Sequence, residues 1–183
     1  MSDRSEDQGE DADSRRVMDY EDVSVYTLDD ADEQRLLDAQ SELTFMWTNR
    51  EGWPVGVIMS FVHRDGRFWV TGSRQRARFK AIERDDRVAV CVTSTGSKIG
   101  GGKTVTYKGR ATIHDDEPTK AWFYPALATK LMAARAGGEG RDERIEEFIR
   151  FLDSPRRVIV EIEPLDRIAY DGAKMAHATA SSR

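Results

Sequence analysis

The chain has 183 residues and a formal net charge of -5. That length supports one domain with a substantial core, and a second domain is not expected. No apolar run is long enough to span a bilayer and no charged-then-apolar leader is present, so we expect a cytoplasmic protein that does not cross a membrane. The single cysteine, Cys91, has apolar neighbours, which indicates a buried structural thiol rather than a nucleophile.

The negative charge is concentrated near the N-terminus. Met1 to Glu33 holds 13 acidic and 3 basic residues, whereas the remainder holds 20 acidic and 25 basic residues, so the folded part is net positive. The first residues have few apolar side chains to bury, which predicts a disordered acidic tail over residues 1–20. We expect a single domain over residues 21–172 and a loose C-terminal tail over residues 173–183.

A short helix and three strands are predicted in the first half of the domain. Asp29 or Asp30 can cap the helix. Aromatic and β-branched residues then predict strands over 43–49, 53–63 and 68–71. The pair Asp65-Gly66 favours a tight two-residue turn between the second and third strands, which makes them an antiparallel meander.

Further strands and a helical segment follow. Strands are predicted over 88–93 and 104–113, helices within 117–153, and a last strand over 156–164. Short antiparallel strands with few helices between them remove their exposed edges by closing on themselves. We therefore predict a mainly β, α+β fold, in which an antiparallel barrel of six to seven strands carries peripheral helices.

The segment over residues 67–93, RFWVTGSRQRARFKAIERDDRVAVCVT, changes from strand to helix and back to strand. Ser73 is predicted to cap the helix. Basic residues fall at every second position, at Arg74, Arg76, Arg78 and Lys80. Backbone N–H groups at a helix N-terminus favour a phosphate and guanidinium groups add charge-assisted bonds, so this pattern predicts an anion cradle. A solvated basic helix face is the alternative interpretation.

Other patterns that carry chemistry are weak. The segment SKIGGGKT at residues 97–104 ends as a P-loop does, but Ser97 stands where the first glycine belongs and a strand follows instead of a helix. His63, His114 and His177 share no metal-ligand spacing, and no serine lies in a nucleophile-elbow sequence. The side chains thus indicate no hydrolytic or metal chemistry, and without a cofactor the chain offers little chemistry of its own.

The basic segment and its neighbouring strands resemble the FMN-binding split-barrel superfamily. The resemblance rests on residues 78–90, RFKAIERDDRVAV, and covers roughly residues 43–113 and, more weakly, 156–170. This superfamily includes pyridoxamine 5'-phosphate oxidase-like proteins and the flavin/deazaflavin-dependent oxidoreductases that use coenzyme F420. It implies a split barrel and a homodimer whose cofactor sites lie at the subunit interface.

The resemblance also implies which residues bind the cofactor. The ring edge would lie along the backbone of Val57, Ile58, Met59 and Ser60. The phosphate would meet Thr71, Arg76, Arg78 and Lys80. True pyridoxamine phosphate oxidases end in a substrate-binding tail with tryptophan and arginine, whereas this chain has no tryptophan after Trp122, so vitamin B6 synthesis is not expected.

The choice of cofactor depends on charge. FMN ends in one phosphate, whereas F420 continues past its phosphodiester into an oligoglutamate tail, and Arg74, Lys98 and Lys103 exceed what one phosphate needs. We therefore predict an F420-dependent oxidoreductase that transfers hydride to a small conjugated organic acceptor. The alternative is an FMN-binding protein, catalytic or not. Nucleic-acid binding is less favoured, because the cations are not interleaved with exposed aromatic residues on a strand platform.

Removing Met1 to Met18 should leave the melting temperature and the cofactor affinity nearly unchanged, because this segment has too few apolar residues to dock on the domain. Thermal melting and cofactor titration of the truncated and full-length proteins check this. A large drop in melting temperature would show that the acidic segment packs on the barrel.

Overall fold

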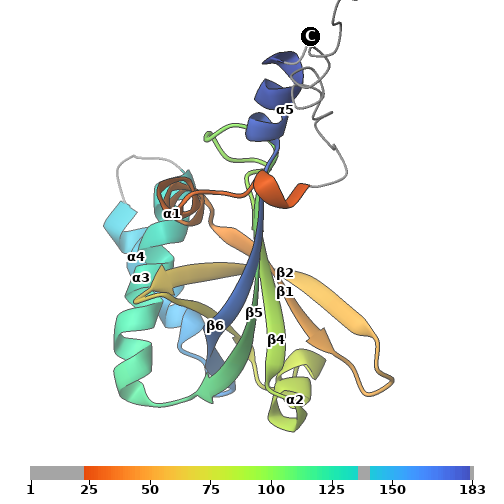
Figure 1. The fold of residues 1–183 in the computed structure, drawn as a ribbon. Helices are drawn as coiled ribbons and strands as arrows, with labels where there is room; N and C mark the ends of the chain where they lie inside the picture. The colour runs from red at the N-terminus through yellow and green to blue at the C-terminus, as the bar shows by residue number, and fades with distance from the viewer. Residues whose placement is uncertain (1–22, 136–140, 182–183) are drawn as a thin grey trace, which may run out of the picture.

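The computed structural model describes residues 23–135 and 141–181, so the predicted acidic tail over residues 1–20 lies outside the described residues. The strands are β1 (Glu42–Thr48), β2 (Pro54–Arg64), β3 (Arg67–Ser73), β4 (Arg87–Thr93), β5 (Lys103–His114) and β6 (Arg157–Asp171). The helices are a 3-10 turn (Val23–Val25), α1 (Asp30–Ala39), α2 (Ala77–Arg84), α3 (Glu117–Arg135), α4 (Arg141–Leu152) and α5 (Gly172–Ser181). Figure 1 shows the strands at the centre of the molecule, with the helices around them.

The strands close into an antiparallel barrel in the order β1-β2-β3-β6-β5-β4 (Figure 1). The predicted α+β barrel of six to seven strands with peripheral helices is therefore confirmed. β6 lies between β3 and β5, so the last strand completes the barrel as the alternation of its residues predicted. Asp65 and Gly66 both have positive φ angles, of 54° and 73°, which is the backbone geometry of the tight turn predicted between β2 and β3.

β6 is longer than the sequence pattern predicts, because it continues past Pro164 to Asp171. Gly109 of β5 pairs with Pro164, whereas Lys108 pairs with Asp166, so Leu165 is an extra residue at a bulge. A bulge is one of the few places in a sheet where proline, which lacks an N–H donor, is tolerated. β6 therefore continues past Pro164, which was expected to end it.

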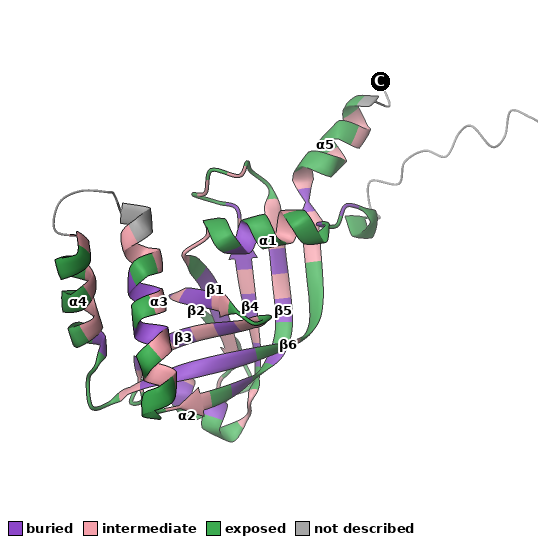
Figure 2. Ribbon diagram, turned by 90° about the vertical axis from the view of Figure 1, so that its left-hand side faces the viewer, coloured by how far each residue is buried: buried purple, intermediate pink, exposed green. Residues whose placement is uncertain are grey.

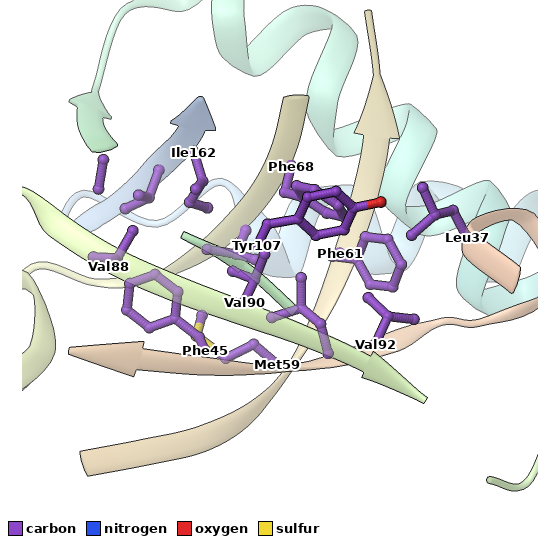
Figure 3. Close-up of a cluster of buried hydrophobic side chains, with 14 of the residues drawn as sticks. Leu37, Phe45, Met59, Phe61, Phe68, Val88, Val90, Val92, Tyr107 and Ile162 are labelled. Carbon is purple, nitrogen blue, oxygen red and sulfur yellow. The ribbon is translucent and has the colours of Figure 1, made fainter. Parts of the chain in front are cut away.

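Side chains that alternate along the strands fill the barrel interior (Figure 3). Phe45, Phe61, Phe68, Val90 and Val160 are all fully buried. Such burial contributes about 1.5–3 kcal/mol for each side chain. Tyr107 reaches the same core, and its ring lies 4.8 Å from that of Phe68.

A second apolar cluster lies outside the barrel, under α3 and α4. Figure 2 shows these two helices side by side along one side of the sheet. Phe123 and Leu127 of α3 and Leu152 of α4 pack against Val62 and Ile159, which point outward from β2 and β6. The helical segment after β5 therefore covers one outer face of the barrel.

Helix α1 closes one end of the barrel. Asp29 caps it as predicted, since its carboxylate accepts a hydrogen bond of 2.8 Å from the N–H of Asp32. Leu36 and Leu37 are buried beneath it. Tyr107 donates a 2.5 Å hydrogen bond to Glu33, and burial raises the pKa of Tyr107 to about 12, so its hydroxyl remains a donor at neutral pH.

Residues 173–181 of the predicted loose tail form helix α5 together with Gly172, and residues 182–183 lie outside the described residues. Figure 2 shows this helix projecting away from the barrel. Asp171 begins it, with a carboxylate that accepts a 2.9 Å hydrogen bond from the N–H of Ala173. Four alanines in the segment favour this helix.

Gly109→Ala should destabilise the protein by about 1–3 kcal/mol, because the new Cβ would lie 2.5 Å from the carbonyl oxygen of Glu163 in the neighbouring strand. Urea unfolding measures this change. Gly101→Ala is the matched control, since a Cβ there meets nothing within 4 Å, and it should be neutral. Equal stability of the two variants would contradict the tight β5–β6 contact.

Candidate functional site

β2 changes partners along its length, which leaves part of its edge open. Residues 54–60 pair with β1, and residues 61–64 pair with β3. On the other side, residues 71–73 of β3 pair with β6 alone. Within the described residues, the edge of β2 over 54–60 and the facing edge of β3 over 71–73 thus have no strand partner. We call this opening in the hydrogen-bonding ladder the split.

The four residues predicted to contact a ring edge lie along the β2 side of the split. Val57 and Met59 face the core, where Met59 is buried, and Ile58 faces outward with 62% of its surface exposed. Ser60 is half-buried. Because alternate backbone groups of a strand point to opposite edges, this stretch offers amide donors and carbonyl acceptors to a ligand in the split.

A shallow apolar groove of about 240 Å³ lies over the same stretch of β2. It is lined by Thr44, Met46, Pro54, Val55, Gly56, Val57 and Ile58. Gly56 contributes to its depth, because a Cβ there would come within 3.2 Å of both the Met46 and the Thr44 side chains. The predicted ring site is therefore next to an apolar surface that a flat ring can cover.

The basic helix begins later than predicted. Ser73 is the last residue of β3 rather than a helix cap, and the N–H of Arg74 continues the ladder by donating a 2.8 Å hydrogen bond to the carbonyl of Arg156. Arg76 takes the N-cap position, and no side chain caps the helix there. The N–H groups of the first turn of α2 therefore have no capping side chain.

Arg78 is the predicted phosphate residue with the most specific surroundings. Its Nε atom is buried and has no hydrogen-bond partner among the described residues. Its guanidinium lies 5.1 Å from the centre of the Phe79 ring and against Gly72 of β3, where a Cβ would be 3.1 Å from the Arg78 Nη2 atom. Burial lowers the pKa of Arg78, and the neighbouring charge of Arg76 lowers it further.

This arrangement fits an anion. A buried guanidinium N–H without a partner costs free energy, which a phosphate oxygen would recover through a charge-assisted hydrogen bond. Arg76 is exposed at the helix start, so Arg78 and Arg76 can serve one phosphate at the β3 side of the split. Thr71 does not join them in this structure, because side chains alternate along β3 and that of Thr71 points to the opposite face from the Gly72 position that Arg78 lies against. The Thr71 hydroxyl donates a 2.7 Å hydrogen bond to the carbonyl of Val158.

Lys80 does not join them. At about 100° per residue, Lys80 and Arg78 lie roughly 200° apart around α2, on opposite sides of the helix. Lys80 instead lines a hollow with Arg74, Arg156 and Arg157. The single anion cradle predicted from the alternating basic residues is therefore divided between two places.

The two loop lysines also have different surroundings. Lys98 is exposed in the loop before β5, as the sequence predicts. Lys103 is the first residue of β5 and forms an ion pair with the buried carboxylate of Asp171. Its Nζ also lies 3.5 Å from Asp32. Burial alone would raise the pKa of Asp171, but the hydrogen bond from Lys103 lowers it below its ordinary value. Lys103 is thus engaged within the protein.

A further set of titratable groups lies on the outer barrel face. His114 Nε2 lies 2.7 Å from Glu161, which also accepts a hydrogen bond from Arg67. Burial alone would raise the pKa of Glu161, but these two partners lower it. Among residues 23–135 and 141–181 no group of histidine, cysteine and carboxylate residues can hold a metal ion. This set therefore acts as an anchor between β3, β5 and β6.

Sequence reasoning missed Arg156 and Arg157. Their adjacency after Pro155 was visible, but only the pairing of β3 with β6 places Arg157 opposite Ser73, and hence beside the basic segment.

In the part of the chain that the structure describes, no helix has the length and apolar character needed to cross a membrane.

Comparison with known proteins identifies a family and a fold. A family profile described as pyridoxamine 5'-phosphate oxidase matches residues 31–165. No curated protein sequence matches the chain. A conserved hypothetical protein of Mycobacterium tuberculosis superposes with a TM-score of 0.65 at 15% identity, covering 82% of this chain and 89% of the other.

Two further solved structures are of proteins named for a function. An F420 reductase superposes with a TM-score of 0.53 at 18% identity, covering 74% of this chain and 94% of its own. The heme storage protein of Vibrio cholerae gives 0.52 at 15% identity, covering 76% and 92%. At these identities the likeness shows a shared fold.

Lys103→Gln should lower the free energy of unfolding by about 3 kcal/mol, because it leaves the buried carboxylate of Asp171 without its cation. Lys98→Gln, in the exposed loop that precedes β5, should change stability by less than about 0.5 kcal/mol. Chemical unfolding of both variants measures this. If the two variants have the same free energy of unfolding, the ion pair between Lys103 and Asp171 does not stabilise the fold.

Proposed function

The chain belongs to the pyridoxamine 5'-phosphate oxidase family, and on that premise we propose that it is an oxidoreductase that binds a deazaflavin, coenzyme F420, in the split. In this proposal it transfers hydride between the reduced cofactor and a small conjugated organic acceptor. Two observations on the described residues carry the proposal: the edge of β2 over residues 54–60 that no strand pairs, and the buried Nε–H of Arg78 that has no hydrogen-bond partner.

The β2 edge suits the ring. Flavin and deazaflavin rings carry hydrogen-bond donors and acceptors along one edge, and the backbone of Val57 to Ser60 offers the complementary groups. An unpaired strand edge is a liability in a folded protein, and a ligand that pairs with it covers it. The apolar groove beside Ile58 would support one face of the ring and keep water from it.

The other end of the split suits a phosphate. Arg78 would donate from Nε, and Arg76 would add a second positive charge; the predicted contact of Thr71 would require its hydroxyl to leave the carbonyl of Val158 and donate to the phosphate instead. Because Phe79 and Gly72 hold the Arg78 guanidinium, its geometry is largely fixed before a ligand arrives. When bound, the deazaflavin supplies the hydride chemistry, and the chain supplies binding, orientation and a dry site.

A second copy of the chain would complete the site. Ile58, Leu165 and Ile168 each expose more than 60% of their surface, which is high for large apolar residues. Leu165 lines an outer hollow of about 410 Å³ together with Met46 and Pro54 of the β1–β2 hairpin. We propose that a homodimer covers this surface and shields the ring site next to it.

FMN is the second candidate, and the ion pairs favour it. Two of the three cations assigned to the glutamate tail of F420 have carboxylate partners, since Arg74 contacts Asp115 and Lys103 contacts Asp171. One phosphate needs only the group around Arg78. In this alternative the protein is an FMN-binding relative of pyridoxamine 5'-phosphate oxidase that acts as an oxidoreductase or holds flavin without turnover.

Arg78→Ala should weaken cofactor binding at least about tenfold, because a lost charge-assisted hydrogen bond costs roughly 1.5–3 kcal/mol. Arg84→Ala, at the other end of α2, should leave affinity within about twofold, although Arg84 contacts the carbonyl of Thr48. Titrating each protein with FMN, FAD and F420, followed by absorbance or fluorescence, measures both effects and identifies the cofactor.

Equal dissociation constants for the two variants would remove Arg78 from the phosphate site. Turnover is tested separately, by mixing the protein with reduced F420 and a quinone or an enone and following cofactor oxidation. Tight binding of F420 with no acceptor reduced would favour a binding protein over an enzyme.

A further inference from the structure

A cationic hollow lies on the opposite side of α2 from Arg78. Its volume is about 420 Å³, and we call it the α2–β6 pocket. It is lined by Arg74, Gln75, Lys80, Glu83, Asp115, Pro155, Arg156, Arg157 and Val158. These residues come from the β3–α2 connection, from α2, from the β5–α3 connection, from the α4–β6 connection and from the start of β6.

The charges in this pocket do not balance. Four cations and two carboxylates line it, which gives a formal charge of +2. Both carboxylates contact the same cation, because Arg74 lies 3.4 Å from Glu83 and 2.8 Å from Asp115. Among the described residues, the other three cations of the lining have no ion-pair partner. Their mutual repulsion destabilises the pocket unless an anion joins them.

One residue of the lining, Arg157, also has a buried side-chain hydrogen-bond donor. Its Nε is buried and has no hydrogen-bond partner within the described residues. Its guanidinium lies 5.5 Å from the centre of the Phe151 ring on α4, a residue outside the lining of the pocket. Guanidinium groups in this situation bind carboxylate or phosphate oxygens in a defined geometry.

The pocket is also held rigidly. Arg157 pairs with Ser73 in the β3–β6 ladder, and its N–H donates to the carbonyl of Ser154 at 2.9 Å. The 2.8 Å bond from the N–H of Arg74 to the carbonyl of Arg156 ties the two walls together. These bonds fix the backbone from which Arg74, Arg156 and Arg157 project, so an anion has less backbone freedom to remove when it binds.

We propose that the α2–β6 pocket is a second anion site, separate from Arg78, for a ligand with two or more charged oxygens. Lys80, Arg156 and Arg157 bind it. Two sources have this chemistry: a free oxyanion, and the carboxylates of the cofactor's glutamate tail. The second source rests on the proposed function, whereas the first does not.

The test is calorimetric titration with inorganic pyrophosphate at fixed chloride concentration. The double variant Arg156→Gln/Arg157→Gln should bind pyrophosphate at least about tenfold more weakly than the parent. Arg35→Gln/Arg150→Gln removes the same charge from exposed positions on α1 and α4 and should bind as the parent does. Lys80→Gln, on the exposed face of α2, repeats the test if the double variant melts early.

Arg78→Ala separates the two sites, because it should weaken FMN binding and leave the pyrophosphate affinity of the pocket unchanged. Unchanged pyrophosphate binding by the pocket variant, or no binding by the parent, would overturn the proposal. So would an equal loss of FMN affinity in the pocket variant and in Arg78→Ala, because the two sites would then be one.

The source of the anion follows from titrating F420 with and without its glutamates. If the pocket variant loses affinity only for the form with the tail, the site holds tail carboxylates. If it treats both forms as the parent does but no longer binds pyrophosphate, the site holds a free oxyanion. A parent that binds neither FMN nor F420 refutes the proposed function, and the pyrophosphate result still decides this inference.

Discussion

The backbone hydrogen-bonding capacity of β2 is the constraint on which the site depends. A strand has two edges, and β2 fills one edge over residues 54–60 with β1 and the other over residues 61–64 with β3. Among the described residues, residues 54–60 therefore pair with a strand along only one edge of β2, and residues 71–73 of β3 likewise pair along only one edge, with β6. Core packing fixes this arrangement, because Met59 and Phe61 must stay inside the barrel.

Much of the fold followed from alternation of apolar residues and from turn chemistry. The strands, the turn at Asp65-Gly66 and the α1 cap at Asp29 are all local features, and local patterns predict them. The start of α2 was misplaced because the extra β3–β6 hydrogen bond at Arg74 is a long-range contact. The same limit applied to Pro164, where the bulge depends on the partner strand.

The candidate site was less predictable, because the sequence shows how many charged residues are present but not which of them form ion pairs. The row of alternating basic residues predicted one cradle, yet helical geometry and the position of β6 divide it between Arg78 and Lys80. Two of the predicted ligand-binding cations also form ion pairs within the protein, Lys103 with Asp171 and Arg74 with Asp115. The composition of the basic segment could not show which cations retain capacity for a ligand.

The position of β6 also bears on how the chain folds. It is the last strand in sequence and lies between β3 and β5. One edge of β3 therefore pairs with residues that follow it by about 90 positions in the chain. Such distant pairings slow folding, because a long loop must close before the contact is gained. During synthesis the first five strands leave the ribosome before β6 does, and their unpaired edges are open to intermolecular pairing until it inserts. The acidic side chains of α1 that bind Arg167 of β6 therefore stabilise the strand that completes the barrel.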